Sequence, residues 1–336
     1  MPMLTPSQVH LDVPLTNLTI AYAQDLNNFV ANRVFGTISV DKRSDRFYKY
    51  DREGMRHGDV KLAAPRTEPN RVGMSLSNDY YRAEVRWLGD DFDEQMLANE
   101  DTMLDVRSQS ANNLIEKMMI DREVRWADTF FKTGVWGTEV AGDASGSVGA
   151  GEVVYWSDYT NSTPIVDVTN ARREMQLKSG GYKPNVMVVG KEVRDILVNH
   201  PDILARLNGG ATVSNTALIT DAKLAEIFEV EQFLVMEAVY NDAKEGLTDN
   251  FEFIGGKHAM MAYKPSSMGL RTPASGAIFT WEALPGVGGG LGITVESFSD
   301  DALKRQQVAE HIQVKCADDM KVIGADLGYF FKDIVS

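Results

Sequence analysis

The glycine-rich run from Pro285 to Gly292 is the first feature that could do chemistry, because loops of this kind can cradle phosphate. A P-loop needs a lysine and then a serine or threonine directly after its last glycine, whereas Leu291, Gly292 and Ile293 stand at the end of this run. A dinucleotide-binding loop follows a strand and opens a helix, whereas these glycines precede an expected strand at 292–298. The run therefore predicts a loop without a phosphate site.

Nucleophiles and metal ligands show no spacing that is typical of a site. The five histidines are widely scattered, and none forms an H-E-x-x-H motif or a pair with cysteine at ligand spacing. There is no G-x-S-x-G or Ser-x-x-Lys motif, and the single cysteine, Cys316, lies in no nucleophile signature. We expect no catalytic residue, no metal site and no cofactor, and we interpret Cys316 as a small core residue on a strand.

Carboxylates are concentrated between residues 90 and 105, where seven acidic residues occur and no basic one. The first four, within 90–94, could bind a divalent cation, but acidic residues in this arrangement more often begin a helix, where they favour the helix dipole. Trp87 and Trp281 could stack on a sugar or a base. Both lie in strand-like runs, so we expect them to be buried instead.

The composition indicates an ordinary globular protein. Of the 336 residues, 43% are hydrophobic and 24% charged, which suffices for one large or two ordinary domains. No stretch approaches the ~20 continuous apolar residues of a membrane span, and the N-terminus lacks the pattern of a secretory signal. One cysteine excludes an intrachain disulfide and fits a reducing cytoplasm. The net charge of −14 argues against a protein that grips DNA, but an acidic protein can still enclose it.

A long β-hairpin is expected near the start of the chain, after an arm that is too polar to form its own core. Strands are predicted at 45–50 and 74–87, with a turn-rich stretch rich in glycine and proline between them. Such a hairpin is marginal alone, so we expect it to pair with another subunit. From Lys42 to Arg86 there are 11 basic and 7 acidic residues, a balance of +4, which is complementary to the acidic stretch that follows.

A long helix is expected over about 94–131, where apolar residues recur at spacings of three and four. A second unit begins at Thr163-Pro164, a cap and proline that open a helix ending at Gly180-Gly181. Strands and short helices then alternate, which indicates an α/β or α+β unit; the helices are expected at 191–199, 201–207 and 221–228. Two antiparallel strands, 306–317 and 320–331, are predicted to meet at Asp318-Asp319.

The order of these parts resembles the major capsid proteins of tailed bacteriophages, whose Hong Kong 97-type fold is shared by encapsulins. Residues 45–50 (DRFYKY) resemble the first strand of the family's extended loop, or E-loop, and 121–131 resemble the end of its spine helix. Residues 184–201 resemble a strand and helix of its axial domain, and 321–331 its closing peripheral strand. The likeness covers about 30–336 and is carried by the order of parts.

The resemblance implies an α+β fold with an N-arm at 1–41, an E-loop hairpin at 42–88, a peripheral domain at 89–160 and 300–336 with its spine helix at about 94–131, and an axial domain at 161–299. It implies a subunit that is no enzyme and self-assembles into hexamers and pentamers of an icosahedral shell. The shell would enclose double-stranded DNA without specific binding, as part of a virion assembled in the host bacterial cytoplasm.

In such shells the E-loop lies across the peripheral domain of a neighbouring subunit. We therefore expect an inter-subunit contact made by Lys49, Arg52, Arg82 and Arg86 on one side and by Asp90, Asp91, Asp93 and Glu94 on the other. About 40 residues precede the E-loop, too few for a helical scaffolding segment, so we expect a separate scaffolding protein besides a portal protein and a decoration protein. Lys61 is a conceivable crosslink donor without an identified acceptor. An encapsulin-like nanocompartment shell and an α/β enzyme with an unrecognised site stay open as alternatives.

Overall fold

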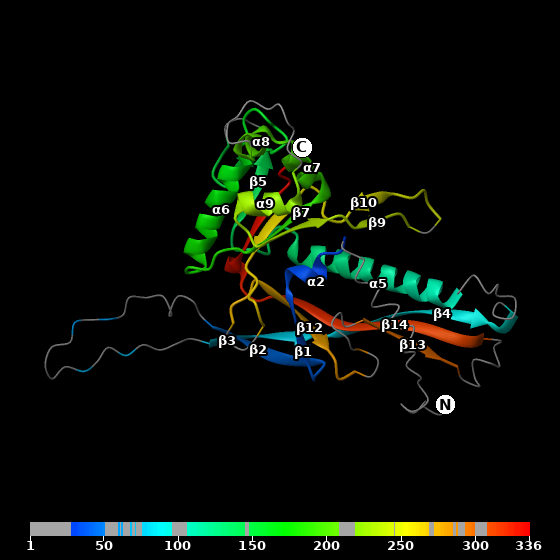
Figure 1. Ribbon diagram of the computed structural model, residues 1–336. Helices are drawn as coiled ribbons and strands as arrows, with labels where there is room; N and C mark the ends of the chain where they lie inside the picture. The colour runs from blue at the N-terminus through cyan, green and yellow to red at the C-terminus, as the bar shows by residue number, and fades with distance from the viewer. Residues whose placement is uncertain are drawn as a thin grey trace.

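The computed structural model describes residues 28–50, 60, 62, 68, 71, 76–95, 106–144, 148–207, 219–244, 246–268, 272–284, 287, 293–299 and 308–336. Figure 1 shows three parts: an upper body of sheet and short helices, a lower arm in which a long helix lies along a sheet, and a hairpin that projects from the other end of that sheet. The fold is mixed α and β, as the sequence predicted.

A six-stranded sheet in the order β6-β5-β15-β11-β7-β8 forms the upper body. Its strand β7 (Val186–Gly190) is buried at every position, which is typical of a strand covered on both faces. Met187 and Val189 of β7 face a core shared with short helices, whereas Val186 and Val188 face a core shared with the end of the long helix. The other strands are β5 (Glu139–Asp143), β6 (Glu152–Val154), β8 (Gln232–Met236), β11 (Ala259–Ala262) and β15 (Gly328–Lys332).

Four helices pack on the upper sheet and begin where the sequence predicted. Helix α6 (Pro164–Lys178) has Thr163 at its N-cap and proline in its first turn, where a missing N–H costs nothing. Its last turn is followed by Gly180, which has a positive φ of 75°, a conformation that glycine adopts without strain. The others are α7 (Lys191–Asn199), α8 (Pro201–Leu207) and α9 (Asp221–Phe228).

The lower arm is a five-stranded sheet in the order β1-β12-β14-β13, with β4 paired to β14 as well. Helix α5 (Val106–Phe130) lies along one face of it (Figure 1). Apolar residues of α5, among them Leu114 and Met118, pack on Ile312 and Val314 of β14. The strands are β1 (Gly36–Val40), β4 (Glu84–Asp93), β12 (Gly276–Trp281), β13 (Ile293–Phe298) and β14 (Val308–Val322).

Two antiparallel hairpins extend from these sheets. The first joins β2 (Ser44–Tyr50) to β3 (Leu76–Arg82), and it lies at the end of the lower arm opposite the acidic end of β4 (Figure 1). The second joins β9 (Val239–Asn241) to β10 (Phe251–Phe253) and projects from the upper body above α5 (Figure 1). Two short helical turns, α2 (Ala31–Val34) and η2 (Ala325–Leu327), complete the described elements.

The predicted C-terminal strand pair is wrong. Asp318 and Asp319 form no turn, since β14 runs straight through them to Val322. The next strand, β15, pairs with β11 and β5 of the upper sheet instead of with β14. Two adjacent aspartates usually favour a turn because they are costly in a strand interior, but here Asp318 has arginine partners within the sheet and helix.

The predicted acidic helix start is also wrong in part. Asp90, Asp91 and Asp93 belong to β4, which pairs with β14 through Asp93. Glu94 and the residue after it are helical, and the long helix is described from Val106 to Phe130. The expected stretch between them, 96–105, lies outside the described residues. Strand pairing outweighs the helix preference because β4 gains a ten-residue ladder against β14.

The expected division into a peripheral domain at 89–160 and 300–336 and an axial domain at 161–299 stays a proposal. The two sheets do not follow these limits in sequence. Strands β12 and β13 lie within 161–299 in sequence, yet both join the sheet of the lower arm. Strand β15 lies within 300–336, yet it joins the upper sheet. The chain therefore crosses between the two bodies several times, and neither sheet is built from one continuous segment.

Candidate assembly surfaces

Asp318, in the middle of β14, ties the long helix and β4 to the sheet. Its side chain is 2% exposed and lies 2.8 Å from Nη1 of Arg125, 3.5 Å from Nε of Arg122 and 3.6 Å from Nη1 of Arg86. Arg122 is itself 1% exposed. A buried charge is tolerated only with such partners, because desolvation of an unpaired ion costs several kcal/mol. This cluster therefore holds α5 and β4 against β14, the strand on which the exposed surfaces of the lower arm depend.

Glu123, beside Arg122 on α5, holds the first described residues of the chain in place. Its two carboxylate oxygens accept hydrogen bonds from the backbone N–H groups of Val30 and Ala31, each 2.9 Å long. These donors stand at the start of α2, where N–H groups have no partner within the helix. Burial raises the pKa of Glu123 to about 7, although both donors and Arg122 favour the charged form.

The β2–β3 hairpin has one face on the protein body and one face in solvent. On the inner face, the rings of Phe47 and Tyr81 lie 5.3 and 4.7 Å from the ring of Phe279. The register pairs Arg46 with Tyr80 and Tyr48 with Asn78, which places these side chains on the opposite face. Arg82 pairs with Ser44 on that same face. The outer face thus combines aromatic rings with positive charge.

The aromatic side chains on that outer face are unusually exposed. Tyr48 is 62% and Tyr80 64% exposed, and Arg46 and Arg82 are exposed as well. Lys49, in contrast, lies 2.7 Å from Asp79 and donates to the carbonyl of Val322, so its charge is used within the chain. Exposed tyrosine and arginine are the residue types enriched at protein interfaces.

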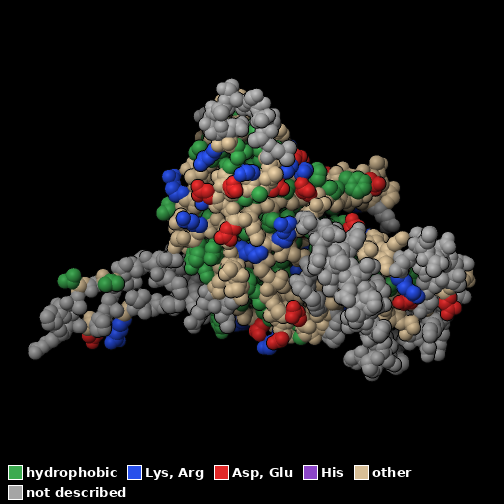
Figure 2. Space-filling view, in the orientation of Figure 1, with side chains coloured by type: hydrophobic (Ala, Val, Ile, Leu, Met, Phe, Trp, Pro, Cys, Tyr) green, Lys and Arg blue, Asp and Glu red, His purple; other side chains and the backbone are tan. Residues whose placement is uncertain are grey.

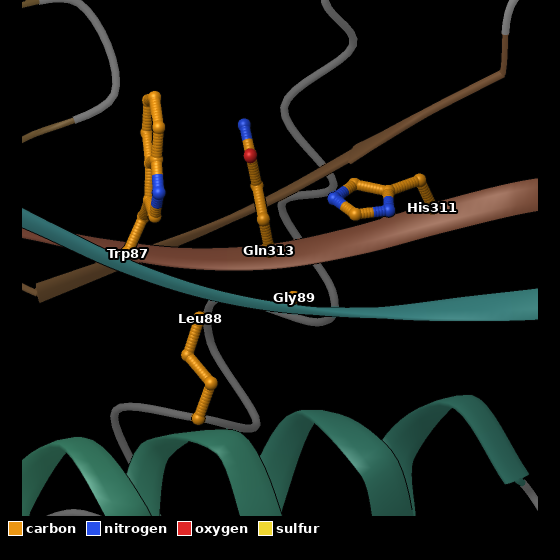
Figure 3. Close-up of a pocket in the computed structure, with 5 residues that line it drawn as sticks. All are labelled: Trp87, Leu88, Gly89, His311 and Gln313. Carbon is orange, nitrogen blue, oxygen red and sulfur yellow. The ribbon is translucent and has the colours of Figure 1, made fainter.

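The sheet of the lower arm has its own exposed face, on the side away from α5. Figure 3 shows Trp87, Gln313 and His311 standing on this side of the β4–β14 pair, while Leu88 points the other way, toward α5. These residues and Gly89 line a pocket of about 260 Å³. Trp87 is 70% exposed, so the expectation that it is buried is wrong.

Gly89 keeps the pocket open. A Cβ at this position would lie 2.7 Å from the imidazole ring of His311, which is closer than real Cβ contacts come. The His311 ring is hydrogen-bonded to the carboxylate of Asp91 and lies 4.8 Å from the ring of Phe298. On this face the ring of Trp87 is followed by the polar side chains of Gln313 and His311 and then by the carboxylates at the acidic end of β4.

The structure separates the eight predicted contact residues into those that have partners within the chain and those that are exposed without an ion pair. Arg86 is paired with Glu84 and Asp318, Lys49 with Asp79, Asp90 with Ser110, and Asp91 with His311. Within the part of the chain that the structure describes, the exposed side chains of Arg82, Asp93 and Glu94 make no ion pair. Arg52 and Lys61 lie outside the described residues.

The basic hairpin and the acidic end of β4 lie at opposite ends of the lower arm (Figure 1). They cannot meet within one chain. Sequence reasoning missed Arg46, Tyr48 and Tyr80 as surface residues, although the alternation of side chains along 44–50 and 76–82 could have found them. It also missed Trp87, for which the sequence carries no signal of exposure.

Among the described residues, no group of three histidine, cysteine or acidic side chains could hold a metal ion. His200 is buried, with its ring nitrogens 2.9 Å from Oγ of Ser162 and 3.2 Å from the N–H of Asp202, and burial lowers its pKa. Cys316 is buried on β14, as expected, and burial raises its pKa to about 11. No helix in the described segments is long and apolar enough to cross a membrane.

Comparison with known proteins shows that the chain is similar to phage proteins in sequence and in structure. No family model matches the chain. A protein of Pseudomonas phage JBD67 named major capsid protein is 25% identical over 326 residues, which is 97% of each chain. The structure matches a phage-related protein from Bordetella bronchiseptica RB50 with a TM-score of 0.67 and 18% identity, over 97% of this chain and 98% of that one. It matches the capsid of cyanophage P-SCSP1u with a TM-score of 0.59 and 9% identity, over 90% and 88%.

Proposed function

The chain is a homologue of phage major capsid proteins with the Hong Kong 97-type fold, and we propose that its copies form the hexamers and pentamers of an icosahedral shell. The observation that carries the proposal is the placement of two complementary surfaces. An exposed basic and aromatic hairpin projects from one end of the lower arm, and an exposed face with Trp87 and unpaired acidic residues lies toward the other end (Figure 1).

In this assembly the β2–β3 hairpin, as the E-loop, lies across the outer face of β4 and β14 of the next copy. Tyr48 and Tyr80 supply apolar area against Trp87 and the neighbouring pocket, since aromatic anchors in pockets carry much of the energy of an interface. Arg82 approaches Asp93 and Glu94, whose charges have the opposite sign. Charge complementarity of this kind fixes register and orientation more than affinity.

Four of the eight residues in the original contact hypothesis take a different part in this proposal. Lys49, Arg86, Asp90 and Asp91 have partners inside the chain, so they shape the two surfaces without being free to bind. Reversing the charge of Arg86 would place a carboxylate beside the buried Asp318 and disturb the fold. Arg82 alone is therefore the better position at which to test the contact.

The shell encloses double-stranded DNA without binding it in a specific manner, which agrees with the net charge of −14. Its copies assemble in the host bacterial cytoplasm with a separate scaffolding protein and a portal protein, with a decoration protein as a further partner of the finished head. The subunit acts as a structural protein and needs no catalytic site or cofactor.

Gel filtration followed by negative-stain electron microscopy of the purified chain tests the proposal. Rings or closed shells in the megadalton range support it, and an oligomer of a few copies that never forms rings would overturn it. An encapsulin-like nanocompartment is the second candidate, since encapsulins share this fold. Shells that contain DNA when isolated from phage-producing cells favour a phage head, and shells that contain a protein cargo favour the second candidate.

A further inference from the structure

The β9–β10 hairpin of the upper body carries apolar side chains that the described part of the chain leaves exposed. It consists of two strands, which is marginal without a supporting surface. The register pairs Phe253 with Val239 and Phe251 with Asn241, so these side chains share one face. Phe251 is 68% exposed, and Val239 and Phe253 are each 40% exposed.

The opposite face of this hairpin is turned toward α5. Tyr240 pairs with Glu252 on that face, and the charges of Asp242, Glu252 and Asp128 of α5 add to partial burial in raising the pKa of Tyr240. The apolar face with Phe251 therefore points away from the long helix. The segment 239–253 also carries four acidic residues and one basic residue.

Helix α6 presents a surface of matching character on the other flank of the upper body (Figure 1). Val166, Asn170, Arg173 and Leu177 follow one another at spacings of four, three and four, and all are exposed, so they form one stripe along the helix. Val166 is 51% and Leu177 77% exposed. Lysine and arginine side chains gather along this flank in Figure 2, whereas the projecting hairpin on the other side shows hydrophobic and acidic ones.

We propose that the apolar face of the β9–β10 hairpin of one copy docks on the exposed stripe of α6 of the next copy. The proposal rests on the proposed shell function and names the contact by which copies join around a capsomer. Phe251 and Phe253 would lie against Leu177 and Val166, and the acidic hairpin would lie beside Arg173.

A second copy of this chain is the occupant because both halves of the contact are present on one chain and face away from each other. A contact between two different surfaces of identical subunits is head-to-tail, and it closes into a ring when the rotation between copies divides a full turn. Opposite flanks are the placement that such a ring needs. A self-complementary patch for a two-fold dimer would instead place both halves on one side.

Cysteine crosslinking of assembled particles tests the contact. In the variant Leu177→Cys/Phe251→Cys, a short bifunctional maleimide should join neighbouring copies into a ladder that reaches six chains on a denaturing gel. Each single-cysteine variant should yield dimers at most, because one reactive thiol per chain cannot extend a ladder. The native Cys316 does not interfere, since it is buried.

A ladder supports docking between copies and excludes a different protein as the occupant of the α6 stripe. Particles that assemble from the double variant and stay uncrosslinked would overturn the docking and leave the shell function intact. Failure of the wild-type chain to form any particle would instead remove the shell function itself. A second variant, Phe251→Ser, keeps the test independent of crosslinker reach: assembled particles should fall at least about tenfold at an unchanged melting temperature. The matched control Val148→Ser, at another exposed apolar position, should assemble normally, and normal assembly of Phe251→Ser would count against the docking.

Discussion

Charged side chains of the lower arm are paired and buried at its centre, whereas some of those on its outer surfaces are exposed without an ion pair. At the centre, Asp318 is 2% exposed and three arginines surround it. On the β2–β3 hairpin, Tyr48 and Tyr80 are more than 60% exposed, and the side chain of Arg82 makes no ion pair with the described residues. The comparison teaches that the chain pairs one set of charges by folding and leaves the other set exposed, where the proposed contact between copies needs it. Substitutions at the centre should therefore change stability, and substitutions on the surfaces should change assembly.

Removing the charge of Asp318 should have the largest effect on stability. Asp318→Asn keeps the shape of the side chain but leaves Arg122, Arg125 and Arg86 without their shared anion, which should lower the free energy of unfolding by about 3–5 kcal/mol. Urea unfolding followed by circular dichroism measures this. Asp121→Asn is the matched control, because Asp121 pairs with Arg125 at the surface and should cost under ~1 kcal/mol. Equal losses in the two variants would contradict the distinction.

Glu123 should make the free energy of unfolding depend on pH. Its folded-state pKa of about 7 is above the ordinary value of 4.5, so the folded state holds the proton more tightly than the unfolded state. The contribution of Glu123 to stability is therefore fully present below pH 4.5 and is lost as the pH rises from 4.5 through 7, by about 3 kcal/mol at ~1.4 kcal/mol per pKa unit. Glu123→Gln should lose this slope. Parallel stability profiles of the two proteins between pH 5 and pH 8 would show that Glu123 does not titrate as described.

Trp87→Ala should leave the fold intact and impair assembly. Its side chain is 70% exposed, so the free energy of unfolding should change by under ~0.5 kcal/mol. An interface anchor contributes about 2 kcal/mol or more, so the protein concentration needed for assembly should rise about thirtyfold. Light scattering over a concentration series measures that threshold. An unchanged threshold would remove Trp87 from the contact.

Arg82→Glu should have the smallest effect, and salt should modulate it. A single exposed ion pair contributes about 0.2–1 kcal/mol, and reversal adds repulsion from Asp93 and Glu94. The assembly threshold should therefore rise a few-fold at low salt and approach that of the wild type near 1 M salt, where the Debye length is about 3 Å. Lys223→Glu, on α9 and 52% exposed, is the matched control. Equal effects of both variants would point to net charge instead of a specific contact.

Local signals in the sequence were sufficient for the upper body. Proline after a capping threonine located α6, and the proline at position 201 together with apolar spacing located α7 and α8 with their observed bounds. The path of β14 was not predictable in the same way. Asp318 and Asp319 resemble a turn until the arginines of α5 are placed beside them, and Arg125 is 193 residues away in sequence.

The candidate surfaces were predicted in outline from charge, because a basic hairpin followed by an acidic stretch is visible in the sequence. Which of those charges stay free was not visible. Arg86 and Arg82 are four positions apart, yet one reaches Asp318 and the other is exposed. Such differences depend on which residues of distant elements lie opposite each strand, and only the assembled sheet defines that.

Electron cryo-microscopy of assembled particles tests the central comparison most directly. The outer face of β4 and β14 should be covered in the particle, with the β2–β3 hairpin of a neighbouring copy lying over Trp87 and its basic end near Asp93. Tyr48 and Tyr80, exposed in the single chain, should be buried there. Closed particles in which Trp87 and both tyrosines stay open to solvent would contradict the account.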